Sequence, residues 1–322
     1  MLLKPDTVAA WEERVMRHRL RARLRVAAAL GLAGVLLLTG CGKPGGVDGT
    51  ITDDWAPVAA PTGFTPRAGV CHLASFAEVG PRAAYEEIEC ALQHRTETVH
   101  VGAYPRPAAE ASAPPAPGSA GARAAYRDCD ERTTAYVGGP WRAARLWIGV
   151  VHPTASAWTG GARWYRCDVQ EITSVEDDGG VVQRIGTLRG ALKKATSPLR
   201  LTCYAIKLSS AGAIDTMPAA TCASKHNAEF VGLWDAGDSP YPTEDEHWKK
   251  FHDACRRKIA SYVGVPVDAD LEFRTGVVSL PGGEDVWAAG DHAVRCYLWL
   301  DSAELTASLK GRGAKALPVQ YE

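Results

Sequence analysis

The chain has 322 residues, of which 46% are hydrophobic and 23% charged, an ordinary composition for a globular protein with a packed core. Its length leaves room for two domains of usual size. A formal net charge of −1 excludes the strongly basic character with which nucleic-acid-binding proteins neutralise phosphates.

The first 40 residues have the parts of a secretory signal. A cluster of arginines from Arg17 to Arg25 precedes the apolar run VAAALGLAGVLLLTG at 26–40. As a helix this run would measure about 22 Å, less than the ~30 Å hydrocarbon core of a bilayer. The segment Leu38-Thr39-Gly40-Cys41 resembles a bacterial lipobox, in which the cysteine becomes the acylated first residue of the mature protein. We therefore expect a lipoprotein signal peptide at 1–40, a lipid on Cys41, and a location at the extracytoplasmic face of the cell membrane.

The segment that follows has the composition of a tether. Residues 41–66 are rich in Gly and Pro and lack hydrophobic periodicity, which predicts a flexible link between the lipid and the first folded module. Removal of residues 1–40 takes away seven Lys/Arg and three Asp/Glu, which leaves 29 basic and 34 acidic residues. The resulting net charge near −5 argues against nucleic acid or anionic lipid as a partner.

The remaining cysteines and the residues around them occur in two similar sets along the chain. Cys71 and Cys90 are 19 positions apart, as are Cys203 and Cys222. The segment WTGGARWYRC at 158–167 matches WAAGDHAVRC at 287–296 at its Trp, Gly and Arg-Cys positions. We interpret this as a tandem duplication with one module at 67–198 and another at 199–322. An even number of cysteines outside the cytoplasm predicts four disulfides. They would be formed by Cys71, Cys90, Cys129, Cys167, Cys203, Cys222, Cys255 and Cys296.

One helix is predicted in each module. In the first, residues 105–121 are a Pro/Ala insertion expected to form a surface loop, and a helix is expected over 122–137. In the second, Thr243-Glu-Asp-Glu246 predicts a capping box, followed by apolar residues at helical spacing and by Gly264 as the C-terminal stop.

Strands are predicted around the second helix, at 201–206, 228–234, 276–280 and 293–300, where β-branched and aromatic runs are bounded by Gly, Pro and Asp. The fold prediction is therefore α+β, with two small disulfide-stapled modules, each consisting of one helix packed on an antiparallel sheet.

Each module also contains the pattern Cys-x-x-x-His-x-x-Glu, at 90–97 and at 222–229. In one interpretation the histidine caps the turn after the cysteine and the glutamate begins the next strand. In the other, both modules present a small polar binding site. The candidate residues for that site are His94, Glu97, His226 and Glu229.

The sequence indicates no catalytic residue, metal site or cofactor. A zinc site would need the cysteine as a thiolate, but a cysteine partner is available in its own module. A thiol catalyst needs a free cysteine, and none remains once eight have paired. No Gly-x-Ser-x-Gly elbow is present. The sequence thus favours a protein without enzymatic activity.

The order of these motifs resembles the septum formation family of actinobacterial secreted and membrane-anchored proteins. The resemblance rests on a Cys, then Cys-x-x-x-His-x-x-Glu, then a helical Cys, then Trp-x-x-Gly before Arg-Cys, and it covers most of 66–322 as two copies. The second copy is the closer match. The first departs from the pattern through its insertion and through Gln93, where Pro often precedes the His. The resemblance implies a link to cell division.

Three disulfide patterns are compatible with modules that each close on themselves. We expect the nested one, because it would join the first and last strands of a module and fasten the helix to the sheet. Its pairs are Cys71–Cys167, Cys90–Cys129, Cys203–Cys296 and Cys222–Cys255.

The function expected from the sequence is that of a lipid-anchored, extracytoplasmic binding or scaffolding protein of the cell envelope. Its partners would be the membrane, through the anchor, and an envelope or division protein, with no nucleic acid. Two alternatives stay open: an envelope enzyme acting on the cell wall or on thiols, and a sensor of a small ligand.

Overall fold

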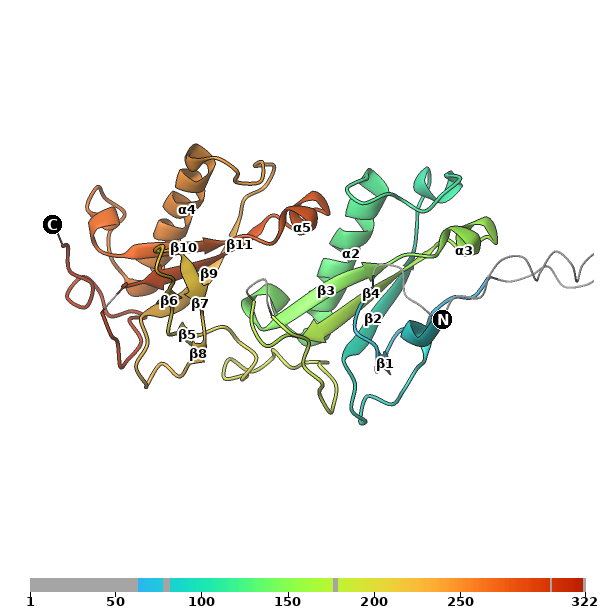
Figure 1. The fold of residues 1–322 in the computed structure, drawn as a ribbon, viewed down its shortest axis with the longest axis horizontal. Helices are drawn as coiled ribbons and strands as arrows, with labels where there is room; N and C mark the ends of the chain where they lie inside the picture. Colours follow the sequence, from blue (N-terminus) through green and yellow to red (C-terminus); the bar gives the residue numbers. More distant parts are fainter. Residues whose placement is uncertain (1–62, 78–81, 176–178, 302, 321–322) are drawn as a thin grey trace, which may run out of the picture. The chain divides into compact units, whose positions relative to one another are not determined.

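The computed structural model describes residues 63–77, 82–175, 179–301 and 303–320. The predicted signal peptide, Cys41 and nearly all of the predicted tether lie outside these residues. The described chain forms two principal antiparallel sheets, and one long helix packs on each of them (Figure 1). This mixed architecture agrees with the α+β prediction.

The N-terminal sheet has the strand order β1-β2-β4-β3, with every neighbouring pair antiparallel. Its strands are β1 (Val70–His72), β2 (Thr96–Ala103), β3 (Leu146–Val151) and β4 (Trp164–Glu171). Between them lie the helix α2 (Ala120–Val137), the short helix α3 (Ala155–Thr159) and the 3-10 turns η2 (Arg82–Tyr85), η3 (Ala108–Glu110) and η4 (Trp141–Ala143).

The C-terminal sheet has the order β10-β11-β9-β5-β8 and is also antiparallel. Its strands are β5 (Cys203–Tyr204), β8 (Ala219–Ala220), β9 (Ala228–Asp235), β10 (Gly276–Leu280) and β11 (Ala293–Trp299). The other elements are the hairpin of β6 (Lys207–Leu208) and β7 (Ile214–Thr216), the helices α4 (Asp245–Val263) and α5 (Glu284–Ala288), and the 3-10 turn η5 (Leu271–Phe273).

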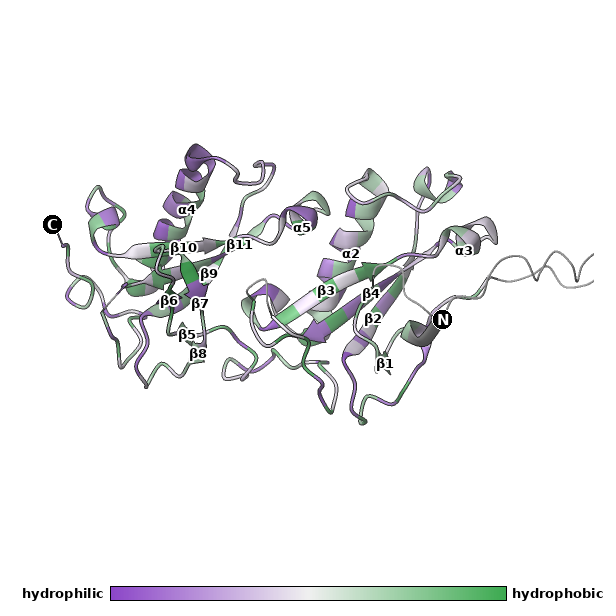
Figure 2. Cartoon of the chain, viewed as in Figure 1, coloured by the Kyte–Doolittle hydropathy of each residue, from purple (hydrophilic) through white to green (hydrophobic). Residues whose placement is uncertain are grey.

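Strand alternation decides which side chains meet the helices. Along β11, the buried residues Val294, Cys296 and Leu298 share one face and pack in the same clusters as Phe251 and Ile259 of α4. Figure 2 shows hydrophilic residues over the first turns of α4 and a mainly hydrophobic β9. Burial of this apolar stripe, rather than helix propensity, holds α4 in place.

Both long helices end at a glycine in the left-handed conformation. Gly138 has φ 81° and Gly264 has φ 86°, values that a side chain with Cβ rarely adopts. The expected capping box of α4 is wrong: the N-cap is Glu244, and no side chain caps it. The first turn instead carries Asp245 and Glu246, whose charges favour the positive end of the helix dipole.

The nested disulfide pattern is also wrong. The bridges join sequence neighbours: Cys71–Cys90, Cys129–Cys167, Cys203–Cys222 and Cys255–Cys296. The nested pattern assumed that the first and last strands of a module are adjacent, whereas β2 lies between β1 and β4, and β9 between β5 and β11. The cysteine on each long helix is bonded to an inner strand of its sheet, β4 or β11. The first cysteine of each set pairs with a cysteine in the chain segment that returns beside its own strand.

None of the helices in the described part of the chain is both long enough and apolar enough to cross a membrane.

The disulfide arrangement can be tested by peptide mapping and stability. Non-reducing digestion should release the four neighbour-paired peptides. Cys255→Ala/Cys296→Ala should lower the free energy of unfolding by about 4 kcal/mol and Cys203→Ala/Cys222→Ala by about 3 kcal/mol, because the chain-entropy gain grows with loop length; the two bridges span 41 and 19 positions. A Cys71–Cys167 or Cys203–Cys296 peptide would contradict the structure.

Candidate functional site

His94 and Glu97 lie together in the interior of the N-terminal half. The His94 ring donates from Nδ1 to the carbonyl of Leu92 at 2.8 Å, and its Nε2 is 3.2 Å from Glu97 Oε1. Glu97 stands near the start of β2, and its carboxylate gathers three further donors. These are the Tyr136 hydroxyl at 2.9 Å, the Thr187 hydroxyl at 2.8 Å and the Leu188 N–H at 2.6 Å.

The C-terminal half repeats these five contacts, although Arg184 Nε, 3.9 Å from Glu97 Oε1, is an additional contact of the N-terminal network. His226 donates from Nδ1 to the carbonyl of Ser224 at 2.8 Å, and its Nε2 is 3.4 Å from Glu229 Oε1. The same carboxylate accepts from the Tyr262 hydroxyl at 2.7 Å, the Ser308 hydroxyl at 2.7 Å and the Leu309 N–H at 2.8 Å. In both halves the glutamate thus connects a strand, the last turn of the long helix and a later segment of the chain.

The side chains of these networks are buried, and their polar atoms are used in hydrogen bonds within the protein. His94, Glu97, His226 and Glu229 are each at most 2% exposed. Because Nδ1 of each histidine faces a carbonyl oxygen, Nδ1 is the donor of that bond. None of the four residues is among those that line the clefts described below. The network therefore stabilises the interior of the protein, and a ligand could reach it only after local opening of the structure.

A metal-like grouping is present in both networks. Ligand atoms of Cys71, His94 and Glu97 lie within 4.8 Å of one another, as do those of Cys203, His226 and Glu229. Metal ligation needs a deprotonated thiolate, but both sulfur atoms are held in disulfides. The carboxylates already accept four hydrogen bonds each. The grouping therefore does not fit a metal centre.

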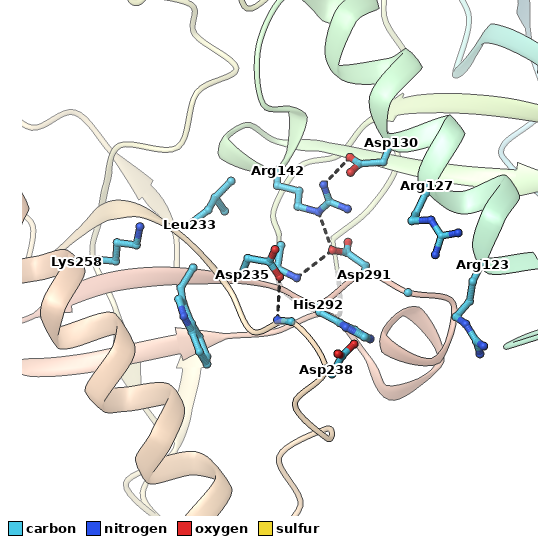
Figure 3. Close-up of a pocket in the computed structure, with 14 residues that line it drawn as sticks. Arg123, Arg127, Asp130, Arg142, Leu233, Asp235, Asp238, Lys258, Asp291 and His292 are labelled. Carbon is cyan, nitrogen blue, oxygen red and sulfur yellow. Dashed lines mark hydrogen bonds and ion pairs between the residues drawn. The ribbon is translucent and has the colours of Figure 1, made fainter. Parts of the chain in front are cut away.

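A cleft of about 660 Å³ lies elsewhere, with walls from both halves (Figure 3). We call it the Arg142 cleft, after the residue of η4 at its floor. Arg142 Nε donates to Asp291 Oδ1 at 2.7 Å, and its Nη1 donates to Asp130 Oδ1 at 2.5 Å. The Tyr126 hydroxyl donates to the other oxygen of Asp291 at 2.8 Å. Arg295 adds a bond from Nε to the Arg142 carbonyl at 3.0 Å.

Electrostatics fix the charge states of this floor. Burial on its own would lower the pKa of Arg142, but the carboxylates of Asp291 and Asp130 raise it by more, so the guanidinium stays charged. Burial, and next the charge of Asp291, raise the pKa of Tyr126 well above its ordinary value. Tyr126 therefore remains a neutral donor. Arg142 is thus paired with one carboxylate from each half, and these bonds tie the first half to the second.

The walls carry charges that are not paired. Arg123 and Arg127 extend from α2 on one side, and Lys258 stands on α4 on the other (Figure 3). Asp235 is the last residue of β9, and Asp238 lies in the loop that follows. No ion pair between described residues involves any of these five side chains, although Arg123 donates to the Gly118 carbonyl and Asp235 accepts from the Gly237 N–H at 2.9 Å.

This arrangement is suited to binding a charged partner. The polar groups of the floor form their hydrogen bonds with one another. The wall charges of both signs are instead free to pair with a charged partner, and pairs formed on a rigid, partly buried surface give specificity.

Sequence reasoning missed this cleft because it followed what the two repeats share. Asp291 lies within WAAGDHAVRC, opposite Ala162 of WTGGARWYRC. The usable signal was this disagreement: a charged residue in one copy stands opposite an apolar residue in the other.

Comparison with known proteins gives one positive finding. A family model described as septum formation matches residues 68–296. No curated protein and no solved structure matches the chain.

The buried networks predict large losses of stability. Glu229→Gln should lower the free energy of unfolding by about 3 kcal/mol, because the amide has one acceptor oxygen where the carboxylate serves four donors. Glu97→Gln should cost a similar amount, whereas the exposed Glu304→Gln should change stability by less than about 0.5 kcal/mol. His226→Ala should cost more than the ~1 kcal/mol of a lost turn cap, because its ring is also buried.

Chemical denaturation followed by tryptophan fluorescence measures these values. A loss below about 1 kcal/mol for both glutamate variants would show that the networks do not hold the fold.

Proposed function

The chain belongs to the septum formation family, and from this we propose that it is a binding or scaffolding protein of the cell envelope that takes part in septum formation during cell division. It acts without catalysis, by holding a charged protein partner from the envelope or the division machinery.

We propose that the chain is a tandem duplication with modules at 67–198 and 199–322. Three observations support this. The strand orders β3-β4-β2-β1 and β10-β11-β9-β5 correspond strand by strand. A helix cysteine is bonded to a central strand in each half. The His–Glu–Tyr networks have the same donors and acceptors.

The protein is proposed to reach its site of action through a lipid on Cys41. Support comes from the lipobox-like segment 38–41, from the basic and apolar residues that precede it, and from the four disulfides, which form and persist in oxidising compartments outside the cytoplasm. The anchor would hold the folded part at the extracytoplasmic face of the membrane without a spanning helix.

The Arg142 cleft is the proposed docking site for the partner. The observation that carries this proposal is the contrast between its paired floor and its unpaired walls. The paired floor keeps the two halves in one arrangement, so little conformational entropy is lost when a partner binds. The unpaired charges of both signs favour a protein segment that itself carries both signs over a uniformly charged polymer.

The anchor is tested by Cys41→Ala. This variant should leave the lipid fraction or accumulate as an uncleaved precursor, because no acyl group can be attached. Fractionation of cells and mass measurement of the product distinguish the outcomes. Normal membrane retention at the normal mature mass would contradict the lipid anchor.

The docking site is tested by photo-crosslinking in intact cells. A photoreactive residue placed at Asp238 should give a discrete crosslinked product, and one placed at Arg132, which lies on α2 but does not line the cleft, should not. The Asp238 product should be lost when Arg127→Gln is added and kept when Glu131→Gln, a change outside the cleft, is added instead. Equal products from both placements would contradict docking at the Arg142 cleft.

A further inference from the structure

A second cleft, of about 650 Å³, opens beside α4 and β9 in the C-terminal half. We call it the Arg200 cleft. Its charged lining residues are Arg200, Lys258 and Lys310, and no acidic residue lines it among the described residues. Its apolar wall includes Phe230 and Tyr262. It shares only Lys258 and Leu233 with the Arg142 cleft.

Arg200 is held in place by the backbone. Its Nε donates to the Lys194 carbonyl at 3.2 Å, and its Nη2 donates to the Leu192 carbonyl at 2.5 Å. These bonds use two of the five N–H groups and neutralise no charge, since both acceptors are neutral. The guanidinium is therefore oriented in advance, with donors left for a ligand.

Lys310 is positioned through the buried network. The Tyr262 hydroxyl is fixed by Glu229, and the Lys310 ammonium lies 5.9 Å from the centre of the Tyr262 ring. Ser308, which also donates to Glu229, accepts from the Lys310 N–H at 3.2 Å. No ion pair between described residues involves Arg200, Lys258 or Lys310.

The N-terminal half has similar groups, but one of its cations is paired with a carboxylate. Arg189 lies 4.4 Å above the Tyr136 ring, as Lys310 lies above Tyr262. On α2, however, Arg132 pairs with Asp128 four residues earlier, at 3.2 Å. On α4, the residue four positions before Lys258 is the buried Ala254, so no carboxylate pairs with that lysine from the same helix. Unlike the Arg142 cleft, the Arg200 cleft combines three such cations with no acidic residue among the described residues that line it.

We infer that the Arg200 cleft binds a phosphate or pyrophosphate group. Three cations that line one cleft, one of them a planar guanidinium held by carbonyls, match the charge and the several acceptor oxygens of such a group. The aromatic and aliphatic wall would contact the part of the ligand next to the phosphate. Because the chain carries slightly more acidic than basic residues, its overall charge does not attract anions, and the attraction must come from this cleft.

The test uses inorganic pyrophosphate and the full-length protein in a non-ionic detergent, with binding followed by calorimetry. Saturable binding with about one site per chain is expected, weakened by added NaCl. Lys310→Ser should weaken it at least about tenfold, and Arg200→Gln by more, since each removes charge-assisted hydrogen bonds. The matched control is Arg189→Ser, which removes the corresponding cation of the N-terminal half and should leave binding unchanged. Lys310 and Arg189 are both exposed, so neither change should disturb folding.

Phosphatidylglycerol added to the detergent micelles identifies the source of the phosphate. Competition with pyrophosphate would identify a lipid headgroup as the natural ligand, and lack of competition would identify a soluble phosphate compound; both outcomes support the site. Absence of saturable pyrophosphate binding, or equal weakening by Arg189→Ser and Lys310→Ser, would overturn it. The Asp238 crosslink is measured separately, so failure of one proposal leaves the other intact.

Discussion

The buried glutamate of each half is the constraint around which the rest of the structure is arranged. A carboxylate in an apolar interior costs several kcal/mol unless donors surround it. Glu97 and Glu229 satisfy this requirement with a histidine, a tyrosine, a hydroxyl and a backbone N–H, drawn from segments up to 91 positions away. Removing one donor leaves the charge undercompensated, so these segments must assemble together. The network thereby fixes the strand, the end of the long helix and the later loop in one arrangement.

The disulfides constrain the same helices and strands at a second point. Cys129–Cys167 and Cys255–Cys296 join each helix to an inner strand of its sheet, and all four cysteines are fully buried. The glutamate networks secure the C-terminal turns of those helices through Tyr136 and Tyr262. Each helix is thus fastened at its middle and at its end. The surfaces it presents, among them Arg127 on α2 and Lys258 on α4, are held on a rigid base, as a binding site requires.

The two halves share the interior and differ at the surfaces proposed to bind. The networks and disulfides have the same geometry in both. Asp291, by contrast, has an apolar counterpart in the matching segment and forms the link to Arg142, and Lys258 lacks the carboxylate that Arg132 has in Asp128. Where one half has a carboxylate and the other does not, a nearby cation either gains a partner, as Arg142 does in Asp291, or lacks one, as Lys258 does. The fold is therefore maintained by what the halves share, whereas the two proposed binding sites depend on what they do not share.

The sequence by itself determined the fold class, the eight bridged cysteines, the stop of α4 at Gly264 and the strand at 276–280, because each depends on local periodicity or on the chemistry of a residue type. It could place His94 beside Glu97 and His226 beside Glu229, because each pair lies within one turn of chain. Only the tertiary structure decided the disulfide pairing, since this depends on which strand lies between two others, and the burial of the histidines, since this depends on Tyr136, Leu188 and their counterparts far along the chain. Neither cleft could be located from the sequence, although the Asp291/Ala162 difference marks one residue of the Arg142 cleft. Their charges come from separate helices, turns and strand ends, and whether a charge is paired or free is set by distances in space, to which spacing along the chain gives no guide.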